Sequence, residues 1–169
     1  MTIQSDLFPG DQRVRPSQTG MVVTHGADGN VQVLHMQWGL RPKPGERPWT
    51  NIRAEGKSFA EGRCLVVAGE YYIHRKEQPN RGRWCVTWPG EPDFCFAGIW
   101  HPAAADWPAS YAIITCAAGP DLAPYEDRQA VFIAKSRWRD WLEGHVPEEE
   151  LLRPLPFGSL KISPLRRPV

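Results

Sequence analysis

The sequence predicts an α+β fold in which short strands dominate. Two observations support this prediction. The chain holds 17 prolines and 15 glycines among 169 residues, and both residue types destabilise the interior of helices. Its apolar and β-branched residues gather in short runs separated by turn-forming residues, which is typical of strands. We expect one domain, residues 1–169, with a single core.

The first half of the chain predicts a hairpin, a loop and a short helix. Met21–His25 and Val31–Met36 are β-rich and are joined by Gly26–Asn30, which contains an Asp-Gly turn signal. The proline-rich and basic segment Arg41–Pro48 predicts a loop. Glu55–Gly62 could hold one short helix with its apolar residues facing inward.

The second half predicts buried strands and a second hairpin. Cys64–Ile73 is a long apolar run that we interpret as a buried strand interrupted near Gly69. Trp84–Trp88 and Phe94–Trp100 flank the turn Pro89–Asp93 and together predict a hairpin. Further short strands are predicted at Tyr111–Cys116 and Val131–Ile133.

Two helices are predicted near the C-terminus. The first has Ser136 as its N-cap, carries apolar residues at helical spacing and ends at Gly144. The second, Glu148–Leu152, follows Pro147 and has acidic residues in its first turn. We expect both helices to serve packing.

Charge and apolar content exclude several classes of protein. Lys and Arg number 20 against 19 Asp and Glu, a formal net charge of +1, so any basic surface must be local. No stretch approaches about 18 consecutive apolar residues, and Met1–Gly10 lacks the basic start and apolar run of a secretory signal. We expect a soluble, cytoplasmic protein with no membrane partner.

The cysteines and histidines do not predict a metal site. None of the four cysteines forms a C-x-x-C pair, so we expect buried free thiols. His74, His101 and His145 lack the spacing of metal ligands. We therefore expect neither a metal nor a cofactor.

Eight short segments occur in a recognisable order. They are Arg13–Gln18 (RVRPSQ), Trp38–Leu40 (WGL), Asn51–Glu55 (NIRAE), Arg63–Val66 (RCLV), Phe96–Trp100 (FAGIW), Ile113–Thr115 (IIT), Asp127-Arg128 (DR) and Trp138–Leu142 (WRDWL). In this order they resemble the SOS-response-associated peptidase family, abasic-site processing proteins that shield damaged single-stranded DNA. The resemblance implies a compact, mainly antiparallel β fold, with a barrel-like sheet flanked by a few short helices and a positively charged groove for single-stranded DNA.

The residues that carry the family's chemistry are not matched. In the family, an N-terminal cysteine forms a thiazolidine with the abasic aldehyde, and cross-linking, lyase and peptidase activities are attributed to it. Here Thr2 takes that position, and the family's catalytic glutamate and histidine fall on Ile73 and Glu126. Isoleucine cannot transfer a proton, whereas Glu126 could act as an acid or a base. The sequence thus predicts a divergent, shortened member without the cysteine-dependent cross-link or self-cleavage.

The residues that touch DNA in the family are largely retained. The resemblance implies that Asn51 contacts the abasic sugar and that Arg53 lies on the same face of its segment. The planar guanidinium of arginine can form two hydrogen bonds with a phosphate, and the tryptophan ring can stack on an unpaired base. The candidate DNA-binding residues are Arg15, Pro16, Trp38, Arg53, Thr115 and Arg128, and the candidate catalytic residues are Thr2, Asn51 and Glu126.

The sequence is compatible with three functions. The first is a monomeric single-stranded DNA-binding module of the DNA-damage response. The second is a residual enzyme in which the Thr2 amine forms a Schiff base with abasic DNA, as a lyase or a cross-linker. The third is a non-catalytic scaffold that uses exposed tryptophans such as Trp49 and Trp107. We interpret Glu55 as structural, paired with a basic neighbour. The basic residues are interpreted as solvated surface or as phosphate contacts, and they are the patch Arg41, Lys43 and Arg47 and the tail Lys161, Arg166 and Arg167.

Overall fold

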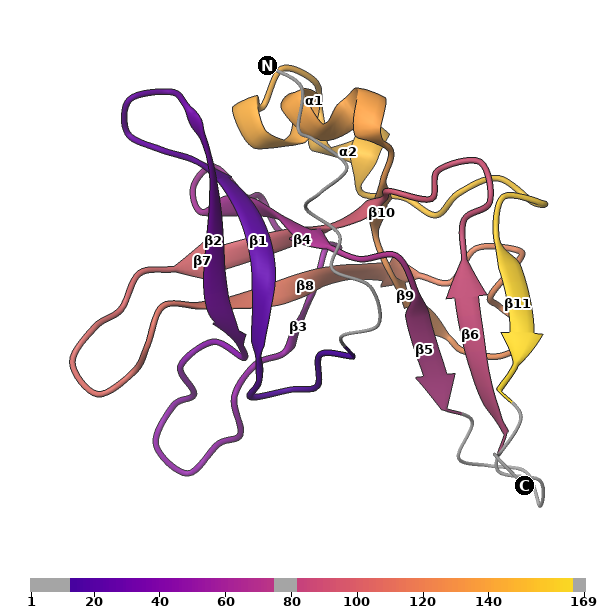
Figure 1. Cartoon of the computed structure of the whole chain (residues 1–169), viewed down its shortest axis with the longest axis horizontal. Helices are drawn as coiled ribbons and strands as arrows, with labels where there is room; N and C mark the ends of the chain where they lie inside the picture. Colours follow the sequence, from indigo (N-terminus) through magenta and orange to yellow (C-terminus); the bar gives the residue numbers. More distant parts are fainter. Residues whose placement is uncertain (1–12, 75–81, 166–169) are drawn as a thin grey trace.

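The strands of this protein form a ring and a separate three-stranded sheet (Figure 1). The computed structural model describes residues 13–74 and 82–165. The strands of the described residues are β1 Thr19–His25, β2 Val31–Trp38, β3 Asn51–Arg53, β4 Arg63–Val67, β5 Tyr71–His74, β6 Arg83–Thr87, β7 Cys95–His101, β8 Ser110–Ala117, β9 Arg128–Ala130, β10 Phe132–Ile133 and β11 Lys161–Pro164. The helices are η2, a 3-10 turn at Lys135–Arg137, and the α-helices α1 Trp138–Glu143 and α2 Glu148–Leu151.

The ring closes because β7 and β8 pair with each other. Following the hydrogen bonds, the order runs β7-β4-β1-β2-β8, and the β7–β8 pairing joins the two ends. Four of these five pairings are antiparallel, and the β2–β8 pairing is parallel. Strand β10 extends the ring from β7, and β3 and β9 extend it from β8. The fold expectation, a mainly antiparallel, barrel-like sheet with a few short helices, is confirmed.

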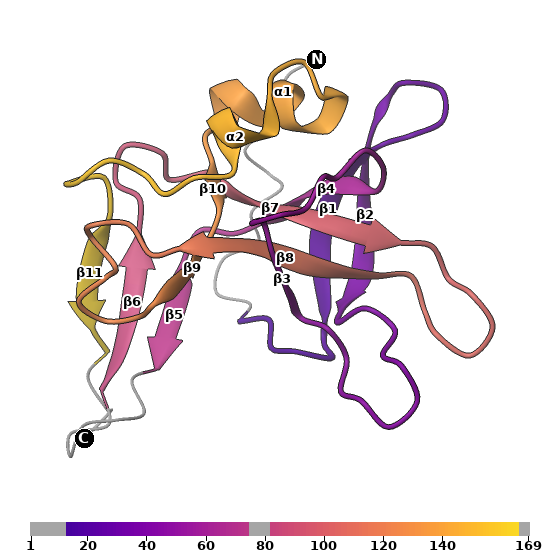
Figure 2. The same cartoon turned by 180° about the vertical axis from the view of Figure 1, so that it is seen from behind.

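The second sheet, in the order β11-β6-β5, stands beside the ring. Figures 1 and 2 show it at the end of the ring remote from the β1–β2 hairpin, with α1 and α2 packed above the ring. The chain crosses from ring to second sheet between β4 and β5, so the predicted interruption near Gly69 is confirmed. No helix in the described ranges is long and apolar enough to span a membrane.

The predicted hairpin of Trp84–Trp88 with Phe94–Trp100 is wrong. Strand β6 pairs with β5 and β11, whereas β7 pairs with β4, β8 and β10. The turn between them carries the chain from one sheet to the other. The two strands still share an interior, because Val86 and Phe96 belong to the same buried cluster.

The ring strands β4, β7 and β8 are buried on both faces, which explains their continuous apolar runs. In β4, Cys64 and Val66 face a first cluster between the ring and the second sheet, whereas Leu65 faces a second cluster beneath the helices. Phe94, Phe96 and Phe132 form the centre of the first cluster, with ring centroids 5.0–5.5 Å apart. Trp138 and Trp141 belong to the second cluster.

All four cysteines are free thiols, as expected, and three of them are buried. Burial raises the pKa of Cys64 and of Cys95, and it raises the pKa of Cys116 to about 11. Cys85 is half-buried, and burial also raises its pKa. These thiols therefore stay protonated near neutral pH.

The predicted helix at Glu55–Gly62 is wrong, and the segment is irregular. Arg63 holds it in place. Its guanidinium donates to the Phe59 carbonyl at 2.6 Å, the Trp141 carbonyl at 3.0 Å and the Glu148 carboxylate at 2.7 Å. Glu148 also accepts the Phe59 amide at 2.9 Å. These side chains bind backbone groups that a helix would otherwise pair internally.

The C-terminal helices and strand agree only in part with the elements predicted from the sequence. Gly144 ends α1 in the left-handed conformation, with φ of 68°, and α2 follows Pro147, as predicted. Ser136 is not the N-cap, because it lies inside the 3-10 turn that precedes α1. Lys161, expected on a solvated tail, begins β11 and pairs with Thr87.

Removal of the Trp141 indole nitrogen tests how the helices are fixed to the ring. Trp141 is fully buried and donates to the Cys64 carbonyl at 2.8 Å. Trp141→Phe is expected to lower the free energy of unfolding by about 1–3 kcal/mol, because it removes a buried hydrogen bond and leaves a small cavity. Chemical denaturation measures this change. Trp49→Phe, at a side chain that is 45% exposed, is the matched control and should change stability by less than about 0.5 kcal/mol.

Candidate functional site

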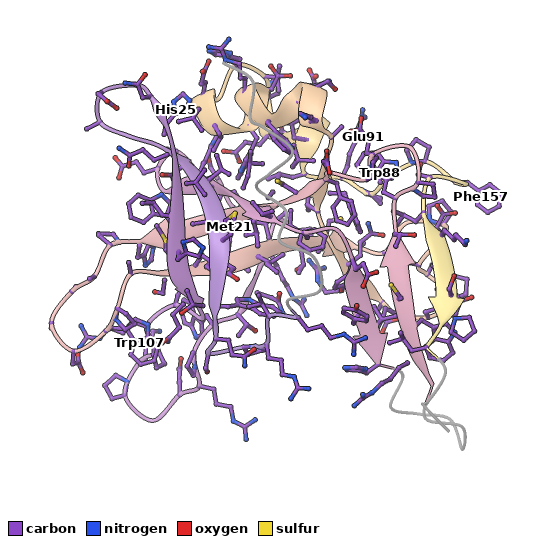
Figure 3. The ribbon with its side chains drawn as sticks, viewed as in Figure 1. Met21, His25, Trp88, Glu91, Trp107 and Phe157 are labelled. Atoms are coloured by element: carbon purple, nitrogen blue, oxygen red, sulfur yellow. The ribbon has the colours of Figure 1, made fainter. Side chains whose placement is uncertain are left out.

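A groove of about 1010 Å³ lies between the ring and the second sheet. One rim is the segment Arg13–Pro16, which precedes β1. The walls come from β1, β2, β3, β8 and β9 on one side and from β5 and β6 on the other. Met21, labelled in Figure 3, lines the groove from β1. Sheet topology thus brings segments far apart in the sequence to one concave surface.

The groove gathers six of the nine candidate residues. Those that line it are Arg15, Pro16, Trp38, Asn51, Thr115 and Arg128. Arg53 is exposed on β3 but does not line the groove, and Glu126 does not line it either. Thr2 lies outside the described residues, as do Arg166 and Arg167 of the basic tail.

Strand β8 sets the positions of Asn51, Thr115 and Arg128. β3 runs parallel to β8, with Asn51 opposite Ile113. β9 runs antiparallel to β8 on its other side, with Arg128 opposite Ala117. Three adjacent strands therefore present their polar residues to the same groove. Asn51 is exposed, and its amide makes only a long contact of 3.5 Å with the Thr50 hydroxyl.

Arg128 is held by a carboxylate and a hydroxyl. Its guanidinium donates two hydrogen bonds to Glu55, at 3.0 and 2.8 Å, and also donates to the Thr115 hydroxyl at 3.1 Å and the Thr115 carbonyl at 2.9 Å. The hydrogen bond from Arg128 lowers the pKa of Glu55 to about 2. The structure confirms that Glu55 pairs with a basic neighbour. Because its guanidinium is occupied in this way, Arg128 fixes Thr115 and the start of β9.

Trp38 and Tyr111 form an aromatic wall of the groove. Their rings are stacked with centroids 6.5 Å apart and an interplanar angle of 5°. The Trp38 indole nitrogen donates to the Thr50 carbonyl at 2.9 Å. A Cβ at position 20 would clash with the Tyr111 hydroxyl, so the close approach of β1 to this wall requires Gly20. The wall is rigid and offers aromatic surface to a ligand.

The charges that line the groove are mixed, with arginines in excess. The lining includes the arginines Arg13, Arg15, Arg83 and Arg128 and the carboxylates Glu70 and Asp93. Arg13 lies over the ring of Tyr72, 4.7 Å from its centroid, and the Tyr72 hydroxyl donates to Glu70. Burial, together with that hydrogen bond, raises the pKa of Tyr72. The described lining thus holds four arginines and two carboxylates, with one of the arginines, Arg128, paired with Glu55, in a chain with a net charge of +1.

Sequence reasoning missed several of these lining residues. Arg13 belongs to the RVRPSQ segment and could have been named from it. Glu70, Tyr71 and Tyr72 precede or belong to β5, for which no partner was predicted, and Arg83 belongs to β6, whose predicted partner is wrong. Their place in the groove depends on the second sheet, which local patterning does not reveal.

The position of the family's glutamate is buried. Ile73 is 3% exposed and belongs to the first core cluster, so it brings no proton-transferring group to the groove. Tyr71 shares this face of β5, whereas Glu70 and Tyr72 lie at alternate positions. Glu126 lies close enough to Tyr71 for its negative charge to raise the pKa of that phenol. Within residues 13–74 and 82–165, no three His, Cys, Asp or Glu side chains are grouped as metal ligands would be.

The two tryptophans of the scaffold hypothesis lie beside the same short segment. Trp49 is 45% exposed and forms a bridge with Leu40. Trp107 is half-buried and donates to the Gly39 carbonyl at 3.2 Å. Figure 3 shows it at the opposite end of the molecule from Phe157, which is 82% exposed. The scaffold hypothesis rests on Trp49 and Trp107, whose partners Leu40 and Gly39 are adjacent, and it stays a prediction.

Comparisons with known proteins agree with the observed fold. A family model described as SOS response associated peptidase matches residues 3–169. Two solved proteins from Bordetella bronchiseptica have TM-scores of 0.73. One is 19% identical, with 91% of this chain and 87% of that chain covered, and the other, a phage-related protein, is 20% identical, with 95% and 87% covered. A protein from Bacteroides thetaiotaomicron is 23% identical over 89% of this chain and 75% of its own, with a TM-score of 0.68. Among curated proteins, none matches the chain.

The Glu55–Arg128 pair predicts a specific acid sensitivity. Because the pKa of Glu55 falls from 4.5 to about 2 on folding, the pair stabilises the fold fully above about pH 4.5, and this stabilisation is lost as the pH falls toward 2. Glu55→Gln should therefore lose less stability than the wild type across that window. Denaturation at a series of pH values measures the effect. Glu61→Gln, at an exposed carboxylate, is the control. If Glu55→Gln lost as much stability as the wild type between pH 4.5 and about pH 2, the stabilising role of the Glu55–Arg128 pair would be contradicted.

Proposed function

The chain belongs to the SOS response associated peptidase family, whose model matches residues 3–169, and we propose that it binds single-stranded DNA in the groove between ring and second sheet. Family membership supports a function associated with the DNA-damage response and an interaction with DNA. The proposal adds the form of the DNA, the place where it binds and the residues that contact it.

One observation carries the proposal. Of the seven residues that the resemblance assigns to DNA, all but Arg53 line the same groove, although they come from separate parts of the chain. They include a cation, Arg15, an aromatic face, Trp38, and an exposed amide, Asn51. These are the group types that bind phosphates, unstacked bases and sugars in single-strand complexes.

Each group has a distinct part in this binding. Arg13, Arg15 and Arg83, which all line the groove, attract the phosphate backbone by releasing its counterions. Trp38, supported from behind by Tyr111, offers a stacking surface to a base. Asn51 can both donate to and accept from the sugar. Arg128 acts as a positioning residue, because Glu55 holds its guanidinium.

We propose that this binding is non-covalent and proceeds without the cysteine-dependent cross-link or self-cleavage. A thiazolidine needs a cysteine with a free amine, and none of the four cysteines lines the groove. Burial raises the pKa of Cys64, Cys95 and Cys116, which suppresses the thiolate. Ile73 in place of the glutamate also removes the carboxylate that would transfer protons around such an adduct.

Fluorescence anisotropy with labelled single-stranded oligonucleotides at low salt tests the proposal. The wild type should bind, with an affinity that falls as salt rises. Arg15→Ala should weaken binding and reduce the slope of log affinity against log salt by about 0.7, because one phosphate contact is lost. Asn51→Ala should weaken the binding of a strand with an abasic site more than that of an intact strand.

Arg139→Ala is the matched control for charge. Arg139 lies on α1 with its side chain 83% exposed and pairs with Glu143, so its removal changes the net charge equally at a remote place. It should leave the salt slope unchanged. Failure of the wild type to bind either intact or abasic strands would refute the proposed function. Equal effects of Arg15→Ala and Arg139→Ala would refute the location in the groove.

A further inference from the structure

Tyr71 is a groove residue to which the family pattern gives no polar role. It begins β5, is half-buried and lines the groove. Its ring packs edge-on against Phe96, with centroids 5.5 Å apart, and against Phe132, with centroids 6.3 Å apart. Two aromatic contacts of this kind fix the direction of the ring and hence the place of its hydroxyl.

Tyr71 shares the groove lining with residues of its polar wall. Ala130, the β9 residue that pairs with Thr115 on β8, lines the same groove. Thr115 belongs to the same strand as Ile113, which lies opposite Asn51. Tyr71, Asn51 and Thr115 therefore line one and the same groove.

The phenol is a neutral group at physiological pH. Burial is the main cause that raises the pKa of Tyr71 to about 12, and the negative charge of Glu126 raises it further, while the Ala130 backbone acts in the opposite direction. A neutral hydroxyl both donates and accepts hydrogen bonds. The nearby carboxylate and the aromatic surroundings disfavour a phosphate oxygen at this place and favour an uncharged oxygen.

We propose that the Tyr71 hydroxyl hydrogen-bonds to the oxygen on C1′ of a base-free deoxyribose and thereby distinguishes an abasic nucleotide from an intact one. This inference rests on the proposed function. A base-free sugar carries a hydroxyl at C1′ when its ring is closed and a carbonyl oxygen when it is open. An intact nucleotide carries its base there instead. The phenol can pair with either oxygen, and it supplies a polar group on the face of β5 where Ile73 supplies none.

Tyr71→Phe tests the inference because it removes one oxygen and keeps the aromatic packing. Three labelled strands of equal length are compared, one with a natural abasic site, one with a tetrahydrofuran site that lacks the C1′ oxygen, and one intact. The variant should bind the natural abasic strand about 3- to 10-fold more weakly, the usual effect of one hydrogen bond. It should bind the other two strands as the wild type does. Removal of the oxygen from protein or ligand thus forms a double-mutant cycle.

Tyr125→Phe is the matched control. Tyr125 packs against Trp84, with centroids 5.4 Å apart, and does not line the groove, so its variant should bind all three strands normally. Thermal unfolding of both variants verifies that the fold is intact. Equal weakening of all three strands by Tyr71→Phe, or no weakening of the natural abasic strand, would overturn the inference. Failure of the wild type to bind any of the strands would refute the proposed function instead.

Discussion

The pairing of β7 with β8 is the interaction on which the rest of the structure depends. It closes the ring, so that β4, β7 and β8 are buried on both faces. One face packs beneath the helices, and the other faces the second sheet and lies beside the groove. Because β8 also carries β3 and β9 on its two sides, closing the ring sets the relative positions of Asn51, Thr115 and Arg128. The groove is therefore built on rigid strands, which lowers the conformational entropy that the protein loses when a ligand binds.

Local patterns predict only part of this fold. The β1–β2 hairpin follows from its Asp-Gly turn, and the end of α1 follows from Gly144. The partners of β6 do not follow from local patterns, because pairing between distant strands depends on which apolar faces meet in the core. The same holds for Lys161–Pro164, whose composition resembles a tail and which becomes a strand only beside β6. The helix expected at residues 55–62 is lost because Arg63 and Glu148 bind the backbone there.

The sequence predicts the residues of the candidate site better than it predicts which strands pair. Ordered motifs name Trp38, Asn51 and Arg128, and all three line the groove. The motifs do not show that Glu55 occupies the guanidinium of Arg128, which turns an expected phosphate ligand into a positioning residue. The motifs also do not identify Tyr71 as a groove residue. Within an apolar run, a tyrosine that lines a groove has the same sequence signal as a tyrosine in the core. Net charge is equally uninformative, since a few arginines along one groove suffice for local attraction.

Under the proposed function, single-stranded DNA enters the groove between ring and second sheet and binds to no other surface. The indole N–H signals of Trp38 and Trp141 in an NMR titration with an oligonucleotide test this claim most directly. Trp38 lines the groove, whereas Trp141 is fully buried under the helices and bonded to the Cys64 carbonyl. We predict that the Trp38 signal shifts progressively as DNA is added and that the Trp141 signal stays in place. Shifts confined to Trp141 and the helices, with Trp38 unchanged under saturating DNA, would contradict the account.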